Sequence, residues 1–326
     1  YKGRVHNSKP EDGLYRSVDG GQSWTQVLPD IPGTTTPFSP SQVVISAAGR
    51  LFVGTMRNVN NKGGARILYS DNGTNWTVMD NYVATIEARD RDNIPDRVIL
   101  ACAPSDPNRV YAILAGAEFE PSTGFTYSRG VMIIKSYTAG MLWTKVHMPE
   151  PAEGDREGQW SFLAWHALTA AVQPDDPDVV WIGGLDLYRS EDGGVNWGQK
   201  SLWWNFGPYY NPQYLVYVHA DQHSLIFRPG STTELLNSND GGVFITTNAK
   251  DQYPYFTEKN NGYNTLQYYS CAIHPEAGKA YYLGGCQDNG TFRTTEIPTS
   301  KDVSVSYGDG TYCFIDEDEP NAQILS

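Results

Sequence analysis

The residues Tyr188-Arg-Ser-Glu-Asp-Gly-Gly-Val-Asn-Trp197 form the unit that decides the fold of this chain. A strand-favouring segment ends at Ser190, and a tight turn begins at Asp192 and Gly193. After the turn comes the large aromatic side chain of Trp197. The Asp carboxylate can accept backbone N–H groups of its own turn, and a glycine can take the positive φ that a Cβ disfavours. Such a hairpin cannot bury its apolar face alone, so we expect several copies to stack.

Further copies of this unit occur along the chain. Tyr15–Trp24 repeats the pattern closely, Asp71–Trp76 retains the Asp, the Gly and the Trp with Tyr69 in the Ser position, and Ser136–Trp143 is a degraded copy. The aromatic positions are Trp24, Trp76, Trp143 and Trp197, and the turn positions Asp19, Asp71, Thr138 and Asp192 stand 52, 67 and 54 residues apart. Periods of this size predict the four-stranded antiparallel blades of a β-propeller.

Strand-like runs between these turns predict five complete blades flanked by two incomplete ones. One complete blade is expected over residues 42–79 and another over residues 168–200, and turns of the type Pro104-Ser-Asp-Pro-Asn108, found in the blade between them, join the first two strands of a blade. The two incomplete blades would either close on each other, giving a six-bladed ring, or belong to a longer propeller of up to eight blades. We expect residues 1–326 to form a single propeller and favour the view that it is a fragment of a longer secreted protein.

The pattern S-x-D-x-G-x-x-W resembles the Asp-box, or bacterial neuraminidase repeat. The chain is thus similar to the Asp-box β-propellers, which include sialidases, xyloglucan-cleaving glycoside hydrolases and the sortilin-type receptor propeller. Gly284-Gly-Cys-Gln-Asp-Asn-Gly-Thr291 and Gly308-Asp-Gly310 resemble secreted Bacteroidetes-type Asp-box proteins. In this family the box is a structural turn away from the ligand face, so the resemblance implies structural roles for Asp19, Asp71 and Asp192.

Composition fits an all-β protein outside the cell. The chain contains 32 Gly, 20 Pro, 21 Tyr, 9 Trp and 11 Phe, which are turn-forming and strand-favouring residues. The net charge of −13 argues against a nucleic-acid partner, because nucleic-acid binding requires a basic face. No stretch is long and apolar enough to predict membrane insertion.

A set of carboxylates is predicted to line one rim of the propeller. In a propeller, the loops before inner strands and those between second and third strands gather on one face, opposite the Asp-box turns. The positions before third strands are Asp12, Asp186, Asp240 and Asp288, and those before inner strands are Asp221 and Asp309. Crowded carboxylates can bind cations, for which Ca²⁺ is the candidate, or divide acid and base roles. The alternative is that Asp-Gly in these loops is turn chemistry alone.

Two of these residues match catalytic positions of the xyloglucan-cleaving family. The resemblance places Asp240, in Asn-Asp-Gly-Gly-Val-Phe, and Asp309, in Gly-Asp-Gly-Thr-Tyr-Cys-Phe, at the family's catalytic carboxylates. The flanking residues depart from the family pattern, with no Arg-Thr before Asp240 and no Gly-Gly after Asp309. The sialidase Arg-Ile-Pro motif is absent, which argues against sialidase activity.

The segment His219-Ala-Asp-Gln-His223 is the sharpest local cluster of polar side chains. Alternate residues of an extended segment share a face, so His219, Asp221 and His223 could converge on a cation or a sugar hydroxyl. The alternative is structural, with the histidines bonded to neighbouring loops. No further cofactor is expected.

An aromatic connection precedes this cluster. Residues 203–214 contain six aromatic side chains, among them Trp203, Trp204 and Tyr209, with interleaved Asn and Gln. Sugar rings stack on such faces while their hydroxyl groups bond to amides, so these residues are candidate ligand contacts. The alternative is that this loop folds over and buries its own rings.

Cysteine is scarce, with Cys102, Cys271, Cys286 and Cys313 and no Cys-x-x-Cys pair. Cys271 and Cys286 fall on the two arms of one expected hairpin, where a cross-strand disulfide is conceivable.

Taken together, these patterns predict a secreted or cell-surface β-propeller that binds a glycan or a protein partner through its loop-rich face without turnover. The competing prediction is a glycoside hydrolase that uses Asp240 and Asp309.

Overall fold

A computed structural model describes residues 13–58, 60–79, 82, 96–121, 124–151, 160–204, 215–263, 266–295 and 302–326. The described chain is all-β, and its strands pair only in antiparallel fashion. The chain divides into two compact units, Tyr1–Lys259 and Asn260–Ser326, which are treated separately below. The prediction that residues 1–326 form one propeller domain stays a prediction.

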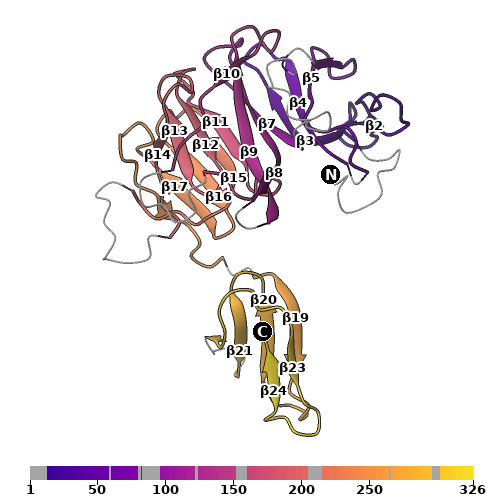
Figure 1. The fold of residues 1–326 in the computed structure, drawn as a ribbon, viewed down its shortest axis with the longest axis vertical. Helices are drawn as coiled ribbons and strands as arrows, with labels where there is room; N and C mark the ends of the chain where they lie inside the picture. The colour runs from indigo at the N-terminus through magenta and orange to yellow at the C-terminus, as the bar shows by residue number, and fades with distance from the viewer. Residues whose placement is uncertain are drawn as a thin grey trace. The chain divides into compact units, whose positions relative to one another are not determined.

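The first unit contains four four-stranded blades (Figure 1). Before them lies the hairpin of β1 (Tyr15–Arg16) and β2 (Thr25–Gln26). The first two blades are β3 (Ser39–Ile45), β4 (Leu51–Met56), β5 (Ile67–Ser70) and β6 (Thr77–Met79), followed by β7 (Arg97–Cys102), β8 (Val110–Glu120), β9 (Phe125–Ser136) and β10 (Thr144–Val146). They join where Met56 of β4 pairs with Arg97 of β7.

Two further blades complete the first unit. They are β11 (Thr169–Val172), β12 (Val180–Gly183), β13 (Leu187–Ser190) and β14 (Gly198–Gln199), then β15 (Gln222–Phe227), β16 (Leu235–Asn239), β17 (Gly242–Thr246) and β18 (Thr257–Glu258). The first strands of the four blades, β3, β7, β11 and β15, contact one another in chain order. They are therefore the inner strands of a propeller, and the strand order within each blade confirms the predicted scheme.

The second unit holds the fifth complete blade, which consists of β19 (Tyr268–Ile273), β20 (Tyr282–Cys286), β21 (Gly290–Thr294) and β22 (Val303–Ser304). A two-stranded sheet of β23 (Cys313–Ile315) and β24 (Gln323–Leu325) follows, and β19 contacts β23. Along the described part of the chain, five blades of four strands lie in sequence between two two-stranded sheets, in the order that the strand-like runs predict.

The core of the first unit lies between successive blades. One cluster combines Phe52 of β4 with Leu100 of β7, and a second combines Ile113 of β8 with Ile182 of β12. A third places Trp181, fully buried, among residues of the β15–β18 blade. Each blade alone would expose these side chains, so burial of apolar area between neighbours stabilises the stack.

The Asp-box turns connect the third and fourth strands of their blades, as predicted. Asp192 Oδ1 accepts hydrogen bonds from the backbone N–H groups of Val195 and Asn196 at 3.0 and 2.8 Å, and Asp19 Oδ1 accepts one from Ser23 at 2.9 Å. The four tryptophans stand directly before the outer strands β2, β6, β10 and β14, at equivalent positions.

The prediction that Asp71 fills this role is wrong. Asn72 Oδ1 accepts the backbone N–H groups of Thr74 and Asn75 at 2.9 and 2.8 Å, whereas Asp71 forms an ion pair with Arg50 at 2.7 Å. Ser70 takes the serine position of this turn, since its hydroxyl accepts the backbone N–H that follows Asn72. The turn is one residue shorter than its relatives, which shifts the acceptor to Asn72.

The cross-strand disulfide between Cys271 and Cys286 does not form. In the β19–β20 pairing, Cys271 lies opposite Gly284 and Tyr268 lies opposite Cys286, with an irregularity between Tyr268 and Ser270. Cys271 is thus paired two residues away from Cys286; Cys271 is exposed, Cys286 is buried, and both thiols are free.

Candidate functional site

One rim of the first unit gathers the loops that precede inner strands and the turns between second and third strands. His166 lies in the connection before β11, Asp221 and His223 lie at the start of β15, and Asp240 lies in the two-residue turn between β16 and β17. This is the rim predicted for ligand binding, opposite in each blade to the Asp-box turns.

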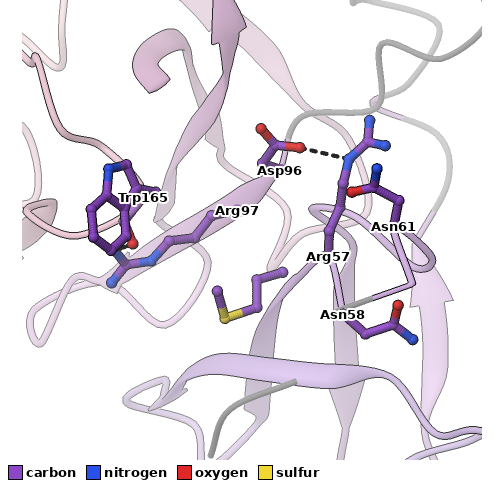
Figure 2. Close-up of a pocket in the computed structure, with 7 residues that line it drawn as sticks. Arg57, Asn58, Asn61, Asp96, Arg97 and Trp165 are labelled. Atoms are coloured by element: carbon purple, nitrogen blue, oxygen red, sulfur yellow. Dashed lines mark hydrogen bonds and ion pairs between the residues drawn. The ribbon is translucent and has the colours of Figure 1, made fainter. Parts of the chain in front are cut away.

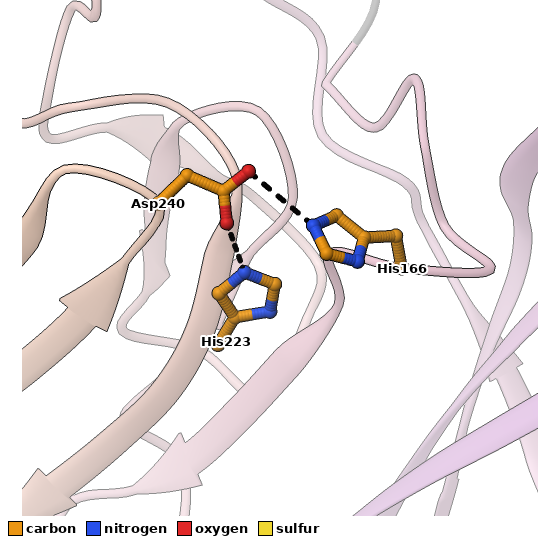
Figure 3. A group of neighbouring side chains, drawn as sticks. All are labelled: His166, His223 and Asp240. Carbon is orange, nitrogen blue, oxygen red and sulfur yellow. Dashed lines mark hydrogen bonds and ion pairs between the residues drawn. The ribbon is translucent and has the colours of Figure 1, made fainter. Parts of the chain in front are cut away.

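Asp240 accepts hydrogen bonds from two imidazoles (Figure 3). Its Oδ2 lies 3.3 Å from His166 Nε2, and its Oδ1 bonds to His223 Nε2. The two rings meet edge to face with centroids 4.5 Å apart. The side chains of all three residues retain about a third of their area exposed, at 38, 32 and 31% for His166, His223 and Asp240. The cluster is thus open to a ligand.

This arrangement favours the ionised form of the Asp240 carboxyl group. Burial disfavours its charged form, but the hydrogen bonds from His166 and His223 outweigh that cost and hold its pKa well below the usual range. The hydrogen bond to Asp240 raises the pKa of His166, against the opposing effect of burial. At neutral pH the cluster therefore offers an ionised carboxylate flanked by two nitrogen ligands or proton donors.

Asp221 lies beside this cluster, but its backbone conformation and its electrostatic environment differ from those of Asp240. Its backbone has φ 64°, the left-handed region that non-glycine residues seldom adopt. Its Oδ1 is buried and has no hydrogen-bond partner among the described residues. Burial raises the pKa of Asp221, the charge of Asp240 adds to this effect, and the nearby histidines oppose it. The two carboxyl groups thus have pKa values displaced in opposite directions.

Buried polar contacts hold the His219–His223 segment in place. Gln222 is fully buried and donates from Nε2 to the carbonyls of Leu185 and His219 at 3.0 and 2.6 Å. The ring of His219 packs against Gly241 so closely that a Cβ there would lie 2.3 Å from it. His219 is therefore structural, because its ring supports the turn that carries Asp240 and its Nδ1 contacts the carbonyl of Ala220 at 3.1 Å.

Arg97 fixes the connection that carries Trp165 and His166. Its Nη1 donates to three consecutive carbonyls, those of Ala164, Trp165 and His166, at 3.3, 3.0 and 3.1 Å. Trp165 remains 46% exposed, and its ring lies 5.3 Å from that of His166. An exposed indole is thereby held next to the histidine and carboxylate cluster.

The Trp165 indole also lines a small pocket. Its lining comes from the end of β4, the loop that follows it and the start of β7, and comprises Met56, Arg57, Asn58, Asn61, Asp96, Arg97 and Trp165. Arg57 pairs with Asp96 at 2.6 Å, and Figure 2 shows the Arg97 side chain extending toward Trp165. Trp165 therefore both lines a pocket rich in amide and guanidinium groups and neighbours His166 of the Asp240 cluster.

The predicted site residues separate into three groups. Asp221, His223 and Asp240 come together as described, with His219 behind them. Asp186 does not join them, and its prediction as a ligand residue is corrected. It is 1% exposed and accepts hydrogen bonds from Ser201 Oγ at 2.5 Å and Gln199 Nε2 at 3.3 Å, so it braces the β13–β14 edge.

The remaining predicted residues are Trp203, Trp204, Tyr209, Asp12, Asp288 and Asp309. Trp204 is buried, Trp203 is half-buried, and Tyr209 and Asp12 lie outside the described residues. Asp288 and Asp309 belong to the second unit, where the carboxylate of Asp309 accepts the backbone N–H of Asp288 at 2.9 Å. Their roles toward a ligand stay predictions.

Sequence reasoning missed His166, Trp165 and Arg97. The signal was present, because Trp165-His166 precedes the inner strand of its blade and Arg97 begins the inner strand of the preceding one. The expectation that residues before inner strands line the ligand rim considered only carboxylates, namely Asp221 and Asp309. Applied to every polar and aromatic residue before an inner strand, it would have found them.

No helix of the described chain is long and apolar enough to cross a membrane.

In chemical terms, the rim offers hydrogen-bond donors and acceptors around one exposed aromatic face. It can bind a polyhydroxylated ligand, accept or donate protons at Asp221 and Asp240, or hold a cation.

Comparison with known proteins places this chain near glycan-cleaving propellers. No family model matches it. It is 26% identical over 246 residues to the xyloglucanase Xgh74A of Acetivibrio thermocellus, an alignment that covers 64% of this chain and 27% of the relative. The chain therefore spans about a quarter of the length of this relative.

Solved structures show similar architecture at low identity. The GH74 enzyme of Niastella koreensis matches 94% of this chain and 47% of its own at 15% identity, with a TM-score of 0.42. The GH74 xyloglucanase of Xanthomonas campestris matches 96% and 43% at 16% identity, with a TM-score of 0.45. YCF48 of Cyanidioschyzon merolae matches 84% and 88% at 11% identity, with a TM-score of 0.35.

Proposed function

We propose that this protein is a secreted or cell-surface β-propeller that binds a glycan at the rim around Trp165. The observation that carries the proposal is the exposed indole of Trp165, whose backbone Arg97 holds and which borders both a polar pocket and the ring of His166. A sugar ring stacks its C–H face on an indole while its hydroxyl groups bond to neighbouring amides, imidazoles and carboxylates.

The polar groups lie where a chain of sugars would need them. Asn61 lines the pocket that Trp165 borders, and His223 and Asp240 remain partly exposed in the neighbouring cluster. A ligand that spans the pocket and the cluster must be extended and rich in hydroxyl groups, which fits a polysaccharide. The likeness to a xyloglucanase supports xyloglucan as the first ligand to test.

The test is retention of the chain on immobilised xyloglucan, with other plant and bacterial polysaccharides in parallel. Trp165→Ala should weaken retention about tenfold, because the stacking face is lost. Trp24→Ala is the matched control, since Trp24 is also an exposed indole, 60% accessible, but belongs to an Asp-box turn. Equal retention of wild type and Trp165→Ala would contradict the proposal. If no polysaccharide is retained, a protein-binding scaffold becomes the better account.

A glycoside hydrolase is the second candidate, and one observation favours it. Asp221, whose pKa is raised, and Asp240, whose pKa is lowered, have the divided character of a general acid and its ionised partner. The predicted pair of Asp240 and Asp309 belongs to two different units and stays a prediction.

Release of reducing ends from xyloglucan separates the two functions. Binding without turnover predicts retention with no release by the wild type. Hydrolysis predicts release that Asp240→Asn and Asp221→Asn each abolish while binding persists. Release unaffected by both substitutions would exclude this carboxylate pair as the catalytic one.

A further inference from the structure

We infer that His166, His223 and Asp240 form a binding site for a divalent transition-metal ion of the Zn²⁺ type, with Asp221 beside it. The three ligand groups come from two adjacent blades and face one another (Figure 3). The site shares His223 and Asp240 with the proposed glycan-binding rim, but its test measures metal binding alone.

The geometry of the three groups suits such an ion. One nitrogen from each imidazole and a carboxylate oxygen all lie within 4.8 Å of one another. Zinc bonds these atoms at about 2.0 to 2.2 Å, which places tetrahedral ligands about 3.5 Å apart. The groups therefore need only small side-chain movements to close on an ion. To bind an ion through Nε2, each imidazole must be neutral and carry its proton on Nδ1, which leaves the Nε2 lone pair free.

The surroundings hold the ligands in place before any ion arrives. Arg97 binds the backbone carbonyl of His166, and Gln222 anchors the segment that carries His223. The ring of His219 supports Gly241, next to Asp240. Ligands fixed by their supporting contacts lose little conformational freedom on binding, which favours a preformed metal site.

Asp221 provides an independent indication of a cation. Its Oδ1 is buried without a hydrogen-bond partner among the described residues, and its backbone is held at φ 64°. A buried carboxylate oxygen without a partner is costly, and a strained residue at such a position is typical of a functional site. A cation bound next to Asp240 would compensate the charge of both carboxylates.

The ligand types select the class of metal. Two imidazoles and one carboxylate are characteristic of Zn²⁺ and related transition-metal ions, whereas Ca²⁺ requires six to eight oxygen ligands. The Ca²⁺ considered from the carboxylate-rich sequence is therefore a poor match for this cluster. Three protein ligands would leave a coordination position open toward solvent, where a water or a sugar hydroxyl can bind.

The test uses the full chain without a histidine tag, stripped with a chelator and titrated with Zn²⁺ in a calorimeter. We expect one ion per chain, and Co²⁺ should give visible absorption bands of a nitrogen-coordinated ion. His166→Gln and His223→Gln should each weaken Zn²⁺ binding at least about tenfold. Glutamine retains an N–H that can donate to Asp240, so the hydrogen-bonded structure is preserved. His147→Gln is the matched control, because His147 is exposed and its Nδ1 contacts the carbonyl of Val195, away from the cluster residues His166, His223 and Asp240.

Several results would overturn the inference. They are the absence of saturable Zn²⁺ binding by the wild type, full binding by the double variant of His166 and His223, and equal loss in the His147 control. Binding of Ca²⁺ as tight as that of Zn²⁺ would also overturn it. If a glutamine variant fails to fold, the Co²⁺ spectrum of the wild type still decides. Failure of metal binding would leave glycan retention unchanged, so the two proposals fail separately.

Discussion

Replacing Asp192 by Ala should destabilise the first unit by about 1 to 2 kcal/mol at pH 7. The Oδ1 atom of Asp192 accepts hydrogen bonds from two backbone N–H groups and from the hydroxyl of Ser190. Its Oδ2 atom accepts a hydrogen bond from Asn196 Nδ2 at 2.7 Å. Burial opposes its ionisation, but the hydrogen bonds from Asn196, Ser190 and Val195 lower its pKa from 3.8 to about 2. That difference corresponds to at most about 2.5 kcal/mol, and solvent screening at this exposed carboxylate reduces it.

The pH dependence follows from the direction of this shift. The pKa of Asp192 is lower in the folded chain than in the unfolded chain, so its stabilising contribution is present in full above about pH 4. It is lost as the pH falls from about 4 to about 2. Wild type and Asp192→Ala should therefore differ at neutral pH and approach each other near pH 2. Asp192→Asn retains a neutral acceptor and should lie between them.

Urea unfolding followed by tryptophan fluorescence is the suitable assay. All nine tryptophans lie in the first unit, so the signal reports that unit alone. Glu150→Ala is the control, because it removes the same charge from an exposed position outside the Asp-box turns. An unchanged unfolding midpoint for Asp192→Ala at pH 7 would refute the reasoning, as would a difference from wild type that persists undiminished at pH 2.

Two further predictions concern the corrected positions. Asn72→Ala should destabilise the first unit by about 1 kcal/mol or more, because Asn72 accepts the backbone N–H groups of its turn. Asp71→Ala should destabilise it by less, because Asp71 forms an exposed ion pair. The reverse order in urea unfolding would restore Asp71 as the turn acceptor. Cys271 should react with a thiol reagent in the folded chain while Cys286 reacts only on unfolding, and recovery of a linked Cys271 and Cys286 peptide by mass spectrometry would contradict the observed register.

The sequence alone determined the architecture. The repeated hairpin with Ser190, Asp192 and Trp197 specifies its own turn through contacts a few residues apart, and strand alternation specifies which faces pack. Both signals are local, so they can be read without a structure. They predicted the strand order of the blades and the positions of the four tryptophans.

Small offsets in register escaped this reading. A turn one residue shorter transfers the acceptor role from Asp71 to Asn72, and a register that differs by two residues from the expected one places Cys271 opposite Gly284 and not opposite Cys286. Asp186 looked equivalent to Asp240 by position, yet Ser201 and Gln199 bury it. Such differences depend on contacts across strands, which local sequence patterns do not record.

The composition of the site was decided by the tertiary structure. His166 and Asp240 are separated by 74 residues and belong to adjacent blades, and only the packing of those blades brings their side chains within hydrogen-bond distance. Arg97, which belongs to a third blade, then fixes the backbone that presents Trp165 and His166. The sequence could name the rim because topology assigns loops to faces. Which side chains meet there depends on distances between blades, and these are set by the packing of the core between them.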